Sequence, residues 1–131
     1  MNTTPETTHY KEFLRIHSNK QQVKLGVIVF IGKDKSTHQT IMYSPSLELS
    51  GYGETANKAE EMFKYALDDF CEYLINLTTK KRDTALAKLG WKSDKLHNKE
   101  FSSIYVDING KLQDFKTSAE DVEVREELVT I

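Results

Sequence analysis

Apolar residues alternate along the first third of the chain as they do in a β-strand. From Val23 to Ile31 every second side chain is apolar, which places these residues on one face of an extended segment. Ile28 and Phe30 add apolar surface to the opposite face, so this strand is expected to be central and buried on both sides. Gly32 to Ser36 has the composition of a turn, and Gln39 to Ser44 is expected to return as the second strand of a hairpin.

A proline and two glycines mark the segment after this hairpin. Pro45 removes a backbone donor, and Gly51 and Gly53 allow positive φ angles that other residues avoid. We therefore expect the chain to bend at Pro45 and to run briefly extended through Leu47 and Leu49 as a short third strand. The two glycines are expected to form a turn that ends this strand.

An amphipathic helix is expected from Ala56 to Leu77, with Thr55 as its N-cap. Its apolar side chains recur at intervals of three and four residues: Ala59, Phe63, Ala66 or Leu67, Phe70, Leu74 and Leu77. Such a stripe is suited to covering one face of the sheet. Four of its members are expected in the core: Phe63, Leu67, Phe70 and Leu74.

The remaining segments are expected to add a shorter helix and further strands. The helix runs from Thr79 to Leu89 and is closed by Gly90. Phe101 to Ile108 alternates as a strand before a turn at Asn109-Gly110, and Val122 to Val129 is expected as a last strand.

The first twenty residues fit two structures. Pro5 and Glu6 suit the start of a helix, whereas the alternation of Leu14 and Ile16 suits a strand. The sequence pattern alone leaves both open.

The whole pattern predicts an α+β fold. A small antiparallel sheet, made of a β-hairpin and a short third strand, would be covered by one main helix and followed by a C-terminal helix and strand extension. Of the 131 residues, 38% are hydrophobic, so residues 1–131 are expected to form a single domain. Its core would lie at about 20–78 and the extension at about 79–131.

Composition and charge narrow the class of protein. The chain has one cysteine, and its polar first residues lack the apolar region of a signal peptide, so a cytoplasmic location is expected. The longest apolar run, Val27 to Ile31, is too short to span a bilayer, so no membrane association is expected. A net charge of −2 gives no overall attraction to nucleic acid. Locally, seven bases against two acids give residues 80–99 a charge of +5, and two bases against six acids give residues 114–127 a charge of −4.

The sequence predicts no catalytic, metal-binding or cofactor-binding residues. The four histidines are dispersed, without the i, i+4 spacing that would direct two imidazoles at one metal ion. Cys71 lies at the edge of the helical stripe, where it acts as a small hydrophobic residue. Gly51-Tyr52-Gly53 lacks the third glycine and the lysine of a nucleotide phosphate loop, and turn geometry explains it better. The expected strands carry too few carboxylates for two-metal hydrolysis.

The loop and the helix resemble one known family. Five residues fit the pattern of the HicB-type antitoxins: Pro45, Leu47, Gly53, Thr55 and Ala59. Ser46 stands where that family has an aspartate, and Lys58 takes the position of a capping-box glutamate. The similarity covers residues 23–77 and implies a HicB-like fold, often described as a partial RNase H fold.

This resemblance implies a non-enzymatic protein that binds and masks a small toxin or effector, because in that family the antitoxin domain covers the toxin's active site. Tyr43, Glu48 and Tyr52 lie in or beside the proline- and glycine-marked loop and are the expected partner contacts. The second face of the two-sided strand also needs a cover, either the N-terminal segment or another copy of the protein, and a homodimer or higher oligomer is expected.

Two other functions remain open. The basic segment could make the chain a nucleic-acid-binding module, with contacts from four residues: Lys81, Arg82, Lys88 and Trp91. The other alternative is an orphan interaction or oligomerisation protein that has no toxin partner.

Overall fold

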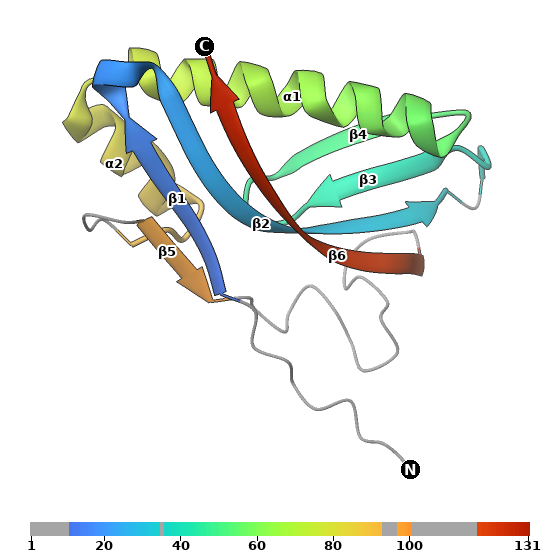
Figure 1. Ribbon diagram of the computed structural model, residues 1–131. Coiled ribbons are helices and arrows are strands. Elements are labelled where there is room, and N and C mark those ends of the chain that lie inside the picture. The colour runs from blue at the N-terminus through green and yellow to red at the C-terminus, as the bar shows by residue number, and fades with distance from the viewer. Residues whose placement is uncertain (1–10, 35, 93–96, 101–117) are drawn as a thin grey trace.

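The computed structural model describes residues 11–34, 36–92, 97–100 and 118–131, with side chains placed at 12–34, 36–92 and 125–131. Within these residues, an antiparallel sheet of six strands carries two helices (Figure 1). The elements are β1 (Lys11–His17), the short 3-10 helix η1 (Ser18–Lys20), β2 (Gln22–Lys33), β3 (Thr40–Ser44), β4 (Leu49–Gly53), α1 (Ala56–Asn76), α2 (Thr79–Lys88), β5 (His97–Glu100) and β6 (Ser118–Thr130). The expected α+β fold, with its hairpin, short third strand and main helix, is confirmed. The third strand begins only at Leu49, however, because Leu47 lies in the turn at residues 45–48.

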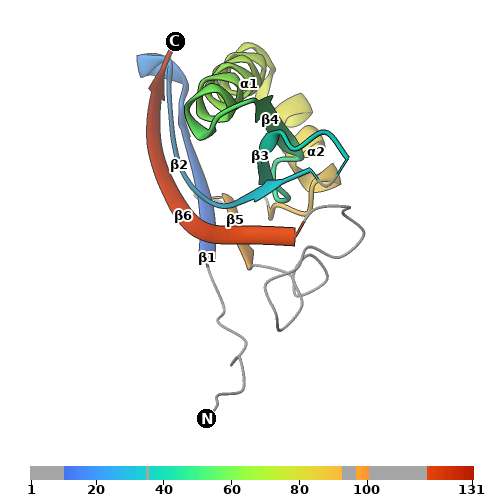
Figure 2. The same ribbon diagram turned by 90° about the vertical axis from the view of Figure 1, so that its right-hand side faces the viewer.

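The sheet is organised around β2. Its strand order is β4-β3-β2-β1-β5, and β6 pairs with β2 outside this path. β1 pairs with the first half of β2, from Gln22 to Gly26, and β3 pairs with the second half, from Phe30 to Lys33. β6 pairs along the whole of β2, so β1 and β3 must share the opposite edge. Figure 2 shows β2 and β6 curving together around α1.

α1 lies in the hollow of this curved sheet and buries one side against it. Thr55 is the N-cap, as expected, because its hydroxyl accepts a hydrogen bond from the Lys58 amide at 3.2 Å. The buried residues of the helix are Ala59, Phe63, Leu67, Cys71, Leu74 and Ile75. Three of the four expected core residues are therefore buried. The prediction was wrong for Phe70, which is half-buried at the margin of the core.

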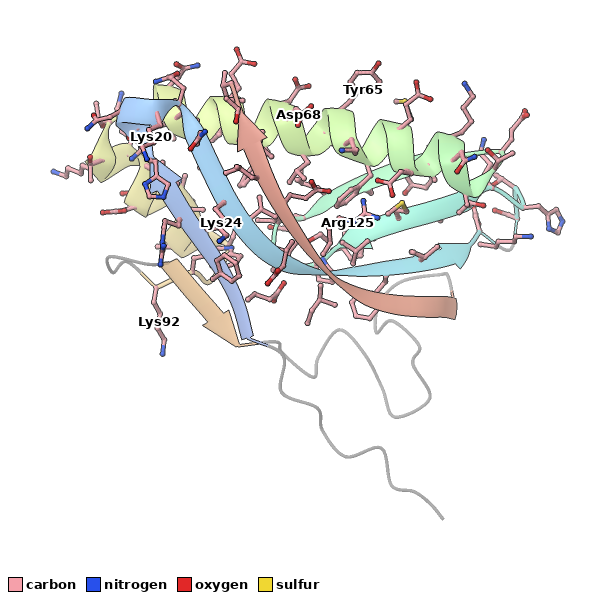
Figure 3. The ribbon with its side chains drawn as sticks, viewed as in Figure 1. Lys20, Lys24, Tyr65, Asp68, Lys92 and Arg125 are labelled. Atoms are coloured by element: carbon pink, nitrogen blue, oxygen red, sulfur yellow. The ribbon has the colours of Figure 1, made fainter. Side chains whose placement is uncertain are left out.

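The buried side of α1 is rotated toward β6 relative to the expected stripe. The Arg125 guanidinium of β6 donates to both carboxylate oxygens of Glu60, with Nη2 to Oε1 at 2.6 Å, and lies 5.8 Å from the centroid of the Phe63 ring (Figure 3). The hydrogen bond from Arg125 is the main reason that the pKa of Glu60 is lowered. Cys71 and Ile75, on this side of the helix, are buried, whereas Phe70 is half-buried.

Gly51 and Gly53 lie in strand β4, so the expected glycine turn was wrong. Neither has a positive φ angle, and the chain turns earlier, at residues 45–48, where Glu48 has a φ of 54°. A Cβ atom at Gly51 would lie 2.4 Å from the Phe63 amide nitrogen and 2.6 Å from the Ala59 carbonyl oxygen. Glycine is needed at this position because the α1 backbone packs directly on β4.

The expectations for the N-terminal and C-terminal segments can be compared with the described strands. Residues 11–17 form strand β1, while a helix start at Pro5 lies outside the described residues. β6 confirms the last strand and extends it on the N-terminal side to Ser118. The strand expected at Phe101–Ile108 and the turn at Asn109-Gly110 also lie outside the described residues, and β5 was not expected from the sequence.

The second face of β2 is covered within a single chain. Ile28 is 0% exposed and Phe30 is 2% exposed. The reason for expecting a second copy of the protein, an uncovered apolar sheet face at these two residues, is therefore removed.

Candidate binding surfaces

The three expected partner contacts lie around strand β4, and they differ in exposure. In the antiparallel pairing of β3 with β4, Tyr43 is opposite Ser50 and Tyr52 is opposite Ile41. Residues at alternate positions share a face, so both tyrosines lie on the sheet face turned away from α1, whereas Gly51 faces the helix. Tyr43 is half-buried, Tyr52 is 46% exposed, and Glu48 is exposed in the preceding turn.

A buried cluster of polar side chains anchors the turn that carries Glu48. The Ser46 hydroxyl donates to Oε2 of Glu12 at 2.6 Å, and the Ser46 carbonyl accepts from Nε1 of Trp91 at 3.0 Å. Ser44 Oγ lies 3.4 Å from Ser46 Oγ. Ser46 is buried and takes part in all of these contacts. The residue that stands where the HicB pattern has an aspartate therefore stabilises the turn from its buried side.

Glu12 fills the gap between β1 and β3 on their shared edge of β2. The pairing of β1 ends at Gly26 and that of β3 begins at Phe30, so the Ile28 amide has neither strand opposite it. Oε2 of Glu12 accepts a hydrogen bond from this amide at 2.9 Å, and the Glu12 side chain is only 2% exposed. The carboxylate thus replaces a strand partner at the fork of the sheet.

Sequence reasoning missed Glu12. The signal was present, because Glu12 precedes Leu14 and Ile16 at the same two-residue spacing and so points to the same face if the segment is a strand. This spacing points to Glu12 only if residues 11–17 form a strand and not a helix.

We expect Glu12→Ala to destabilise the fold by about 2 kcal/mol, because the Ile28 amide and the Ser46 hydroxyl would both lose a buried acceptor. Glu12→Gln retains a carbonyl oxygen of similar position and is expected to cost less than half as much. Urea denaturation of the two variants measures the difference. Equal midpoints for Glu12→Ala and wild type would show that these bonds contribute nothing to stability.

The structure divides the four residues of the nucleic-acid alternative into two pairs. Arg82 is buried and binds the last carbonyls of α1, donating to the oxygens of Leu74 at 2.9 Å, Ile75 at 3.3 Å and Leu77 at 3.1 Å. Trp91 is buried in the cluster beneath Ser46. These two side chains hold the fold together and are not available to a ligand. Lys81 and Lys88 are exposed, as the alternative requires.

Lys81 and Lys88 lie in an open groove between the end of α1 and the outer side of α2. Its volume is about 480 Å³, and it is lined by Tyr73, Leu77, Lys80, Lys81, Thr84, Ala85 and Lys88. Tyr73 is one of three large apolar or aromatic side chains exposed along α1, together with Met62 and Tyr65. None of these three was among the expected contact residues, although each lies off the expected apolar stripe of the helix.

Reactive chemistry is not assembled in the described part of the chain. No group of three or more histidine, cysteine, aspartate or glutamate side chains could hold a metal ion among the described residues. Cys71 is buried, and this burial raises the pKa of its thiol to about 12, with a smaller contribution from Asp68. Neither helix of the described residues has the length and hydropathy needed to cross a membrane.

Comparison with known proteins adds no relative: no family model, no curated protein and no solved structure matches this chain. The resemblance to the HicB-type antitoxins therefore rests on the residues of the loop and the helix N-terminus alone.

Proposed function

We propose that this chain is a non-enzymatic protein-binding domain that masks a small toxin or effector by direct contact, as the resemblance to HicB-type antitoxins implies. The observation that supports this best is the exposed Tyr52 ring on strand β4. Together with Tyr43 and Glu48 it forms what we call the β4 surface.

Two properties of the β4 surface favour a protein partner. The turn before β4 is anchored by the hydrogen bonds of Ser46, and β4 itself packs closely against α1 at Gly51. The backbone that carries Tyr52 is therefore fixed on both sides. A tyrosine on a supported backbone buries much area on binding and loses little conformational entropy. Moreover, β4 is at the end of the strand order and pairs only with β3 among the described strands, so it has a free edge for main-chain contacts.

We expect Tyr52→Ala to weaken binding of the partner by about 2 kcal/mol or more, because the ring would be the central contact of the β4 surface. The partner is first isolated by pull-down from the native host, and its affinity is then measured by calorimetry. This affinity should change little with salt, since an aromatic contact involves no ion pair.

Tyr65→Ala is the matched control, because it removes an equally large exposed tyrosine from the side of α1 turned away from the sheet (Figure 3). It should leave partner binding unchanged. If the two variants weaken binding equally, or if Tyr52→Ala has no effect while the thermal melt stays as in wild type, the β4 surface is not the binding site.

A further inference from the structure

The groove beside α2 has fixed walls. Only Leu77 and Thr78 separate the two helices, and Thr78 caps α2 by accepting a hydrogen bond from the Lys81 amide at 3.3 Å. Arg82 binds three carbonyls at the end of α1, and Leu86 is fully buried in the core. The helices are thus joined at a set angle, so the groove exists before any ligand arrives.

The walls of the groove combine apolar surface with uncompensated positive charge. Leu77 and Ala85 are half-buried, and Tyr73 is 53% exposed at one end. Three lysines line the same groove: Lys80, Lys81 and Lys88. None of the three forms an ion pair with a described residue, and the groove lining contains no acidic side chain.

We propose that this groove binds an acidic amphipathic segment of a protein partner, with an apolar side chain between Leu77 and Ala85 and carboxylates facing the lysines. Charge complementarity identifies the acidic character of the ligand, because three lysines around one groove attract carboxylates and disfavour a basic segment. The apolar walls favour an apolar side chain as the anchoring residue of the bound segment, since a helix or turn with spaced apolar residues is the usual occupant of a groove between two helices.

A peptide fits the groove better than a nucleic acid does. Base stacking needs several accessible aromatic rings, and Tyr73 is the single ring that lines this groove. Trp91, the aromatic residue of the basic segment 80–99 whose side chain is described, is buried. The aliphatic side chains of Leu77 and Ala85 offer contact to a leucine or a phenylalanine and none of the hydrogen bonds by which bases are recognised.

The groove is separate from the β4 surface and is tested with different variants. Short random peptides displayed on phage are selected on the immobilised full-length protein. The enriched peptides are then synthesised, and their binding is measured by fluorescence anisotropy. We expect them to combine an apolar residue with two or more acids. The double variant Lys81→Glu with Lys88→Glu should weaken their binding at least about tenfold.

The matched control reverses two exposed lysines near the other end of α1, in the double variant Lys58→Glu with Lys64→Glu. It should change binding by less than about twofold, because the charges lie away from the groove. Enriched peptides without an excess of acids, or peptides that bind the Lys81 and Lys88 variant as well as wild type, would overturn the proposal. Single-stranded RNA or duplex DNA that binds wild type and is lost only with that variant would also overturn it, and would establish the nucleic-acid alternative.

Discussion

Phe63→Ala is expected to destabilise the protein by about 3–5 kcal/mol, because the ring is fully buried at the centre of the main helix. The β4 backbone at Gly51 packs against the helix backbone at this residue, and the Arg125 guanidinium lies over the ring, 5.8 Å from its centroid. Neither the strand nor the paired arginine can move into the space left by the ring without breaking other contacts, so a cavity should remain.

Phe70→Ala provides the comparison for this effect. It removes the same side chain from the same helix, but Phe70 is half-buried, so its loss should cost less than half as much. Glu61→Ala, at an exposed position, should cost about 0.5 kcal/mol or less. Urea denaturation of the three variants ranks them. Equal costs for the two phenylalanines would mean that α1 is rotated away from the orientation described.

Gly51→Ala is expected to cost about 3 kcal/mol or more, although it adds a single methyl group. The new Cβ would lie 2.4 Å from the Phe63 amide nitrogen, 2.6 Å from the Ala59 carbonyl oxygen and 2.8 Å from the Phe63 Cα. These are all backbone atoms, so the whole helix would have to move away from β4 to make room. The thermal unfolding midpoint measures the loss.

Gly26→Ala is the matched control for this substitution. Its Cβ would approach an atom just as closely, at 2.5 Å, but that atom belongs to the ring of Phe13. A half-buried ring can turn aside, whereas a helix backbone cannot, so Gly26→Ala should cost much less than Gly51→Ala. If the two variants melt at the same temperature, close packing of α1 on β4 is not the reason for glycine at position 51.

The sequence pattern predicted the elements better than it predicted their orientation. The alternation from Val23 to Ile31 and the Thr55 cap depend on neighbouring residues, and both were identified correctly. The orientation of α1 depends on contacts with other segments of the chain, among them β4 at Gly51 and Arg125 of the distant β6. No local periodicity contains this information, so Phe70 was expected in the core although it is only half-buried.

The roles of polar residues were hardest to infer, because they depend on contacts between distant segments. The nucleic-acid alternative placed Arg82 on a binding surface, and its actual partners are carbonyls at the end of the preceding helix. Glu12 was missed because its partners, Ile28 and Ser46, come from two other parts of the sheet. By contrast, Tyr52 was expected as an exposed partner contact, and its side chain is exposed.

The pairing of β6 with β2 has a consequence for the order of folding. β2, β3, β4 and α1 follow one another along the chain, so their contacts close short loops. β6 instead joins Thr130 to Gln22 at one end and Ser118 to Lys33 at the other, and contacts between such distant segments carry a large loop-closure entropy. The hairpin, third strand and helix should therefore assemble first, with β6 adding to the sheet in the slow step that completes the native structure.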